Sequence, residues 1–293
     1  MSTKSDSRAV LALLVSATLW GLIWYPLRLL EEGGINGLWS SLIMYGSLFP
    51  LGLWLARAHW QQLYRHPYLV TVIAVASGWC NVAFIVAVID GNVVRVMLLF
   101  YLSPVWAILI AWWWLREVPH RAAMVTVAVA MSGALIMLWN PELGLPWPQE
   151  ASDWLALSSG LAFALANVAI RASHGLDLSV KMASNWIGVS LVALIWILLV
   201  ASPVPYVPVN WYLLCLLMGL VMLIMTYTVL YGVSHLPIYR SSVILLFELV
   251  AGAVSAQLLT EERISTMEWL GGGLIMLAAY LSARTQQEES IDI

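Results

Sequence analysis

The sequence predicts an all-α integral membrane protein, with ten transmembrane helices in two inverted five-helix repeats and both termini in the cytoplasm. Three observations lead to this prediction: the composition, the spacing of the apolar runs and the placement of the basic residues. Of the 293 residues, 62% are apolar and only 10% are charged, whereas about 25% of residues are charged in a soluble domain. So few charged side chains cannot cover a soluble fold, so lipid must be the solvent for most of the surface.

Ten apolar runs divide the chain. Each is long enough to cross a bilayer, which takes about 20 residues in a helix. The first run is also longer than the apolar region of a cleavable signal peptide. The predicted spans are 9–30, 38–56, 68–89, 93–115, 122–139, 154–173, 180–201, 211–234, 238–260 and 267–283.

The basic residues fall unevenly on the two sides of this topology. Ten of the 13 lie on the side of the amino terminus, namely Lys4, Arg8, Arg57, Arg65, Arg116, Arg121, Arg171, Lys181, Arg240 and Arg284. The other side carries only Arg28, Arg95 and Arg263. Because cytoplasmic loops of inner-membrane proteins hold most of the Lys and Arg, we expect a multi-pass protein of the cell inner membrane.

The second half of the chain resembles the first. When the two halves are aligned with an offset of 145 residues, Glu117 aligns with Glu262. With an offset of 143 residues, Arg28 aligns with Arg171. We therefore divide the chain into a first repeat (1–139), an inter-repeat loop (140–153), a second repeat (154–283) and a cytoplasmic tail (284–293). Since five is an odd number of spans, the second copy enters the membrane from the opposite side, an arrangement typical of transporters.

Four short motifs stand out along the chain: Ala17-Thr-Leu-Trp20-Gly21 in the first span, Pro104 followed by Glu117, Glu262-Arg-Ile-Ser265, and Gly271-Gly-Gly273. Together they resemble the EamA-type signature of the drug/metabolite transporter superfamily. The chain departs from the pattern at Thr126 and Leu249, where the family has Gly and Pro. The resemblance implies a ten-span transporter that moves small organic solutes, usually outward, without ATP.

Glu248 lies ten residues into the ninth span, where an ionised carboxylate costs several kcal/mol unless it is paired or hydrated. Ser241, Gly252 and Ser255 fall near the same helix face. Two interpretations remain open. Glu248 exchanges protons with bulk water and binds a substrate amine, or it is permanently protonated and purely structural.

Aromatic and amide side chains at membrane depth supply further candidates for contact with a substrate, because such groups can line an apolar pocket with a few orienting polar atoms. Together with Glu248, the predicted substrate-binding residues are Trp20, Trp24, Asn81, Tyr101, Asn167, Tyr227 and Tyr231. They would line a cavity between the first, third, fourth, sixth, eighth and ninth spans. Arg95, close to Asp90 in the chain, is an outer gate, a carboxylate anchor for an amino-acid-like substrate, or an Arg whose side chain reaches the interface.

Other chemistries have no support in the sequence. It has no Gly-rich loop ending in Lys-Ser/Thr for a nucleotide, and no His or Cys cluster with the spacing of a metal site. Glu248 has no second acid or His at membrane depth, so we expect no enzyme, no cofactor and no metal. Without a basic block, nucleic acid is not an expected partner.

We therefore expect a secondary transporter that exports small amphipathic metabolites by alternating access. Amino acids or compounds derived from them are the first candidates for the substrate, and protons are the candidate coupling ion. One alternative is uptake or exchange of an organic cation. A second alternative is a membrane scaffold or sensor that transports nothing. The expected partners are a small-molecule substrate and the lipid bilayer, with the protein a monomer or a homodimer.

Overall fold

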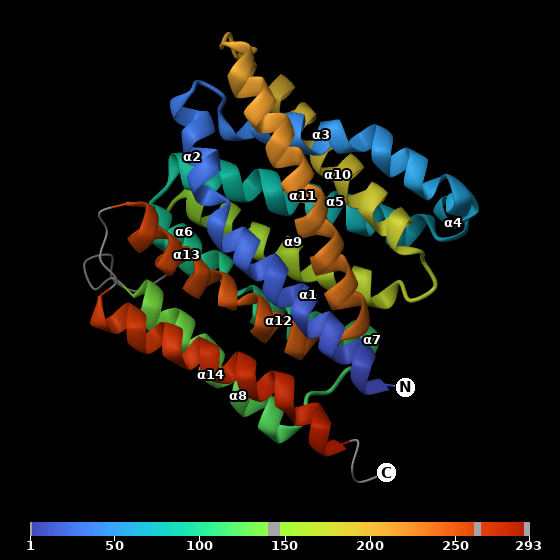
Figure 1. The fold of residues 1–293 in the computed structure, drawn as a ribbon, viewed down its shortest axis with the longest axis vertical. Coiled ribbons are helices and arrows are strands. Elements are labelled where there is room, and N and C mark those ends of the chain that lie inside the picture. The colour runs from blue at the N-terminus through green and yellow to red at the C-terminus, as the bar shows by residue number, and fades with distance from the viewer. Residues whose placement is uncertain (1, 140–146, 261–264, 290–293) are drawn as a thin grey trace.

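A computed structural model describes residues 2–139, 147–260 and 265–289. Within these ranges the chain is helical and contains no strand (Figure 1). A single 3-10 turn, Arg57–His59, precedes α4. The helices are α1 (Ser2–Leu22), α2 (Trp24–Glu32), α3 (Gly37–Ala56), α4 (Trp60–Arg65), α5 (Pro67–Asp90), α6 (Val93–Phe100), α7 (Ser103–Leu115), α8 (Arg121–Leu138), α9 (Ala151–Ala172), α10 (Leu178–Leu199), α11 (Val209–His235), α12 (Ile238–Leu245), α13 (Phe247–Leu259) and α14 (Thr266–Glu289).

Nine stretches of helix in the described ranges are long and apolar enough to cross a membrane. They coincide with the first nine predicted spans, and α14 contains the tenth, so the prediction of a multi-pass helical membrane protein is confirmed. Helix α14 continues to Glu289, into the segment predicted to be a tail. Of the predicted loop 140–153, residues 140–146 lie outside the described residues, as do Glu262 and Arg263.

Three of the spans are broken helices: α1 with α2, α6 with α7, and α12 with α13. A proline lacks an N–H group and clashes with the carbonyl four residues before it. Pro26 and Pro104 therefore account for the ends of α1 at Leu22 and of α6 at Phe100. The third break, at Leu246, has no such proline, and Pro50 lies inside α3 without interrupting it.

Short polar side chains define where several helices begin. The side chain of Asn36 accepts a hydrogen bond from the Trp39 N–H at the start of α3, and that of Asn92 accepts one from the Arg95 N–H at the start of α6. Each satisfies a backbone donor that has no partner inside its helix. Glu150 and Asp153 form a reciprocal capping box at the start of α9.

The helices pack in two related groups around the middle of the molecule. Helix α1 packs against α11, α12 and α13, and α9 packs against α5, α6 and α7. Helices α8 and α14 lie side by side along one edge, while α3 and α10 lie along the opposite edge (Figure 1). Helix α1 begins and α14 ends at the same end of the bundle (Figure 1). A cavity lies between α1 and α13 of the first group and α5 and α6 of the second.

Candidate functional site

A cavity of about 740 Å³ lies between α1 and α2 on one side, α5 and α6 on another, and α13. Its volume is within the range of small-molecule pockets, about 300–1,000 Å³. Most of the wall is apolar or aromatic, with Trp20, Trp24, Phe84, Met97 and Tyr101 among the lining residues. The last turn of α8 and the first turns of α14 and α3 complete the wall. The arrangement suits a small molecule with an apolar body.

The cavity opens at the end of the bundle where α2 ends and α6 begins, which we call the open end. The residues that line it there are exposed: Ile89 and Val93 keep 51% and 49% of their surface, and the Arg28 side chain keeps 59%. Toward the other end, the closed end, the lining residues become buried, and only 8% of Tyr101 is exposed. Among the described lining residues, the exposed ones therefore gather at the open end.

Tyr101 and Glu248 meet at the inner end of the cavity. The Tyr101 hydroxyl donates a hydrogen bond of 3.0 Å to Oε1 of Glu248. Tyr101 follows the last residue of α6, and Glu248 stands in the first turn of α13, so each lies at the break of its span. A carboxylate in the first turn of a helix is stabilised by the helix dipole. The breaks thus place an acid and its hydrogen-bond donor at the bottom of the cavity.

A close contact between α1 and α13 supports this arrangement. A Cβ atom on Gly21 would lie 2.6 Å from the carbonyl oxygen of Glu248 and 2.6 Å from Cβ of Ala251. No side chain fits there, so Gly21 allows the two backbones to touch. One turn further on, the Trp24 indole N–H donates to the Ser255 hydroxyl at 2.9 Å, and that hydroxyl donates in turn to the carbonyl of Gly21 or Gly252. Trp24 is held against the cavity wall by this bond.

The charges around the cavity are mainly acidic. Glu31 and Glu268 line its mouth, and Glu248 lies at its inner end. Glu268 caps α14 by accepting a hydrogen bond from the Ser265 N–H. Arg28, the basic side chain among the lining residues, forms an ion pair of 3.1 Å with Glu32 in its own helix. The cavity is therefore better suited to a positive group than to a negative one.

Four of the eight predicted substrate-binding residues line the cavity: Trp20, Trp24, Tyr101 and Glu248. The structure places Asn81, Asn167, Tyr227 and Tyr231 elsewhere. The sixth and eighth spans, which carry three of these, supply no lining residue, whereas the second, fifth and tenth spans contribute at its edges.

The four residues outside the cavity lie in other packing environments. Asn167 is buried within α9, and Oδ1 of Asn81 is buried in α5 with no hydrogen-bond partner in the described part of the chain. Tyr227 is 47% exposed on α11 and stacks on Tyr231, with 6.2 Å between the ring centres. Tyr231 in turn lies against His235. These tyrosines form a stripe along α11 away from the cavity.

Arg95 has a partner that its position in the chain does not reveal. Its Nη1 donates to Oδ2 of Asp153 at 3.4 Å, and both side chains are largely buried. Asp153 also accepts hydrogen bonds from the backbone of residues 149 and 150 at the start of α9. Arg95 thus connects the start of α6 to the start of α9.

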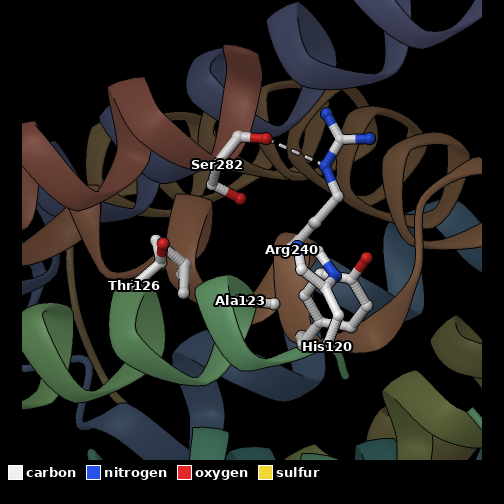
Figure 2. A pocket seen from close by; sticks show the side chains of 7 residues that line it. His120, Ala123, Thr126, Arg240 and Ser282 are labelled. Carbon is white, nitrogen blue, oxygen red and sulfur yellow. Dashed lines mark hydrogen bonds between the residues drawn. The ribbon is translucent and has the colours of Figure 1, made fainter. Parts of the chain in front are cut away.

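A second cavity, near the closed end, has a volume of only about 10 Å³ and lies between α8, α12 and α14. Figure 2 shows His120, Thr126, Arg240 and Ser282 around it, with Nε of Arg240 donating to the Ser282 carbonyl at 2.9 Å. A space of this size holds about one water molecule. It is too small for an organic solute. Among the described residues no three His, Cys, Asp or Glu side chains are grouped as metal ligands are.

Comparisons with known proteins extend over both halves of the chain. A crystal structure whose title reads only "Crystal structure of protein" superposes with a TM-score of 0.75 at 17% sequence identity, covering 95% of this chain and 98% of that chain. At this identity the likeness shows the fold alone. A comparison with curated protein sequences found no match.

The family comparison concerns the first half. Residues 7–139 match the model of the EamA-like transporter family. This segment contains the motifs around Trp20, Pro104 and Glu117 that predicted the resemblance. It also supplies Trp20, Trp24 and Tyr101 to the cavity. The first half of the chain is therefore similar to the EamA-like transporter family, a family of membrane transporters within the drug/metabolite transporter superfamily, as the motifs predicted.

Proposed function

We propose that the protein is a secondary active transporter of the inner membrane that exports small amphipathic metabolites carrying an amino group. The observation that carries the proposal is the cavity, whose exposed lining residues lie toward one end of the described chain and whose inner end holds the Tyr101–Glu248 pair. A solute can enter this cavity without crossing the whole protein, which alternating access requires. The aromatic wall suits an apolar body, and the carboxylate suits an ammonium group.

Two features support an inverted repeat as the basis of alternating access. The fourth and ninth spans are both broken, and an offset of 145 residues sets Tyr101, at the first break, on Leu246, at the second. The packing partners also correspond: the first span contacts the eighth and ninth, as the sixth contacts the third and fourth. Two halves related in this way can exchange conformations, which moves the opening from one side to the other.

The distribution of basic residues gives the proposed orientation. Arg171, Lys181 and Arg240 lie near the closed end, and Arg28 and Arg95 lie near the open end. By the positive-inside rule the closed end is cytoplasmic. The cavity then faces the periplasm, where a transporter driven by the proton gradient takes up protons.

Glu248 would couple the two fluxes. A carboxyl group that binds either a proton or an ammonium group cannot hold both, so arrival of a proton releases the substrate outward and arrival of substrate inside releases the proton. Exchange of this kind needs no cofactor or nucleotide. Amino acids and compounds derived from them remain the first candidates for the substrate.

An organic cation without a carboxylate is a second candidate, and the charges around the cavity favour it. Glu31, Glu248 and Glu268 line the cavity, whereas Arg28 is paired with Glu32 at the mouth. A substrate carboxylate would find no other basic side chain among the described lining residues.

Three probes with the same phenyl ring separate these candidates: 2-phenylethylamine, L-phenylalanine and phenyltrimethylammonium. Purified protein in proteoliposomes is given an imposed pH gradient, and uptake of each labelled probe is measured. An amine transporter moves the first probe, an amino-acid transporter the second, and an organic-cation transporter also moves the third, which cannot lose its charge. Absence of flux for all three and for a wider metabolite panel would support the scaffold or sensor instead.

A further inference from the structure

The closed end of the molecule contains a cluster of charged residues that the cavity does not use. Glu117 follows α7, Arg171 lies near the end of α9, and Lys181 lies in the first part of α10. All three reach the turn that joins α11 to α12, Ser234–Ile238, which we call the inner turn. Lys181 is buried, whereas the side chains of Arg171 and Glu117 keep 18% and 21% of their surface exposed. Charged groups withdrawn from water to this extent are usually paired and hydrogen-bonded.

Each of these side chains binds the end of a helix at or beside the inner turn. Oε1 of Glu117 accepts a hydrogen bond of 2.9 Å from Nε of Arg171, and its Oε2 accepts one of 2.9 Å from the Ile238 N–H, the first of α12. Nη1 of Arg171 donates to the Ser234 carbonyl at 3.0 Å. The groups that they bind are backbone donors and acceptors at helix ends, which have no partner inside the helix.

Lys181 completes the set from a third helix. Its Nζ donates to the Ser234 hydroxyl at 2.9 Å and to the Ile170 carbonyl at 3.0 Å, and only 3% of the residue is exposed. The inner turn is therefore held from α7, α9 and α10 at once. Helices α11 and α12 belong to the group that packs on α1, whereas α7 belongs to the group around α9. The three side chains thus join the two groups of helices.

A closed apolar layer lies directly beside the inner turn. Leu13, Leu230, Val233, Leu236 and Ile238 are each at most 1% exposed and belong to one core cluster. Leu13 lies eight residues before Gly21 of the cavity wall on α1, about 12 Å toward the closed end. A path to that side would require the layer to part, and the layer cannot part while the inner turn is held in place.

The corresponding features at the open end are not engaged in this way. The repeat sets Arg28 on Arg171, and the α5–α6 turn, Asp90–Asn92, corresponds to the inner turn. Arg28 pairs with Glu32 in its own helix, and in the described residues no hydrogen bond joins it to the α5–α6 turn. The cavity mouth lies between them. At the closed end Arg171 therefore binds the inner turn, whereas at the open end Arg28 binds Glu32 in its own helix.

We infer that Glu117, Arg171 and Lys181 form the gate of the closed end, holding the inner turn while the cavity faces the open end and releasing it when the closed end opens. This inference rests on the alternating access of the proposed function. It assigns a role in transport to charged residues that lie outside the substrate cavity. The gate is formed by hydrogen bonds to helix ends, so each transport cycle breaks and remakes them.

Cysteine labelling tests the gate without any substrate. Cys80 and Cys215 are replaced by Ala, Val233→Cys is introduced into the apolar layer, and a water-soluble maleimide is applied to right-side-out and inverted vesicles. With Glu117→Gln, the isosteric amide lacks the charge that binds Arg171, and we expect labelling from the closed end to become at least tenfold faster. Glu32→Gln, which removes a carboxylate from a surface pair, is the control and should label as slowly as the parent. Equal labelling rates in Glu117→Gln and the control, with both proteins folded, would overturn the gate.

A cross-link provides a second measurement in case Glu117→Gln is unstable. In the variant Glu117→Cys/Ile238→Cys, a short bis-methanethiosulfonate reagent forms a disulfide with each thiol, releasing methanesulfinate, and ties the α7–α8 connection to α12. We expect loss of probe flux, which a reducing agent reverses. Flux that persists through a complete cross-link would refute the gate. Because the labelling needs no substrate, failure to find a transported probe would leave the labelling result standing.

Discussion

The Tyr101 hydroxyl donates to the Glu248 carboxylate across the middle of the molecule, joining the broken fourth span to the broken ninth. The two residues come from different halves of the chain. The hydrogen bond can therefore form only while the two halves keep this relative position. A proton or an ammonium group that binds Glu248 competes with the Tyr101 hydroxyl for the same oxygen atoms. Occupancy of the site is thereby linked to the contact between the halves.

Tyr101→Phe removes the hydroxyl and keeps the ring, which packs edge-on against Phe100. A hydrogen bond to a charged group contributes about 1.5–3 kcal/mol, so we expect probe flux to fall by roughly tenfold or more while the protein stays folded. Flux in proteoliposomes and thermal melting in detergent measure the two effects. Tyr231→Phe, on α11 away from the cavity, is the matched control and should retain normal flux. Equal loss in both variants would count against the special position of Tyr101.

The contact between α1 and α13 predicts a strong effect of Gly21→Ala. The new Cβ would lie 2.6 Å from the Glu248 carbonyl oxygen, so the helices must separate, and overpacking of this type costs about 1–3 kcal/mol. We expect a lower melting temperature and reduced flux. Gly273→Ala is the control, because no atom lies within 4 Å of its Cβ and Ala favours helix by about 1 kcal/mol. A Gly21→Ala protein as stable as this control would show that the contact is not tight.

Ser255→Ala leaves the Trp24 indole N–H without its acceptor. Because an unsatisfied donor costs about 1–3 kcal/mol, we expect Trp24 to move from the wall and the affinity for an aromatic probe to fall several-fold. Ser184→Ala is the control, since that hydroxyl bonds only to the Val180 carbonyl inside α10. Probe titration followed by tryptophan fluorescence makes the comparison. Unchanged affinity in Ser255→Ala would mean that Trp24 needs no such support.

Asp177 stabilises the start of α10 outside the membrane-spanning segment. Burial raises the pKa of its carboxyl group, but hydrogen bonds from Ser179 and the nearby His59 and Lys181 outweigh burial and leave the pKa below its ordinary value. The stabilisation is therefore complete above the ordinary aspartate pKa, about 3.9, and is lost as the pH falls through the lowered value. We expect Asp177→Ala to remove about 1 kcal/mol at neutral pH and much less in strong acid. Melting curves of both proteins across this pH range measure the difference in their stability. A difference that does not shrink in acid would contradict the role of Asp177 as a helix cap.

Much of the fold could be predicted because the local amino-acid composition is enough to identify a transmembrane span. A run of about 20 apolar residues is recognisable without knowledge of its neighbours, so nine predicted spans coincide with helices. The broken helices were harder to predict. Pro26 and Pro104 mark two of the breaks, but Pro50 lies in an uninterrupted helix and the break at Leu246 has no proline.

The residues that line the cavity could be predicted only in part, because hydropathy does not show which face of a membrane helix points toward the cavity. In lipid the outer and inner faces of a span are both apolar, so Tyr227 on the exposed face of α11 looks like Tyr101 at the inner end of the cavity. Glu248 was identifiable because a carboxylate at membrane depth is energetically costly and is usually functional. Phe84 and Met97 carried no such signal, although both line the cavity.

Proton-driven flux of Glu248→Gln in proteoliposomes is the most direct test of proton coupling at Glu248. The amide is nearly isosteric and still accepts a hydrogen bond from Tyr101, so folding should be retained, as thermal melting and gel filtration would show. We predict that the pH gradient no longer drives the best-transported phenyl probe, while Glu32→Gln behaves as the unmodified protein. Unchanged proton-driven flux in a folded Glu248→Gln protein would contradict this prediction.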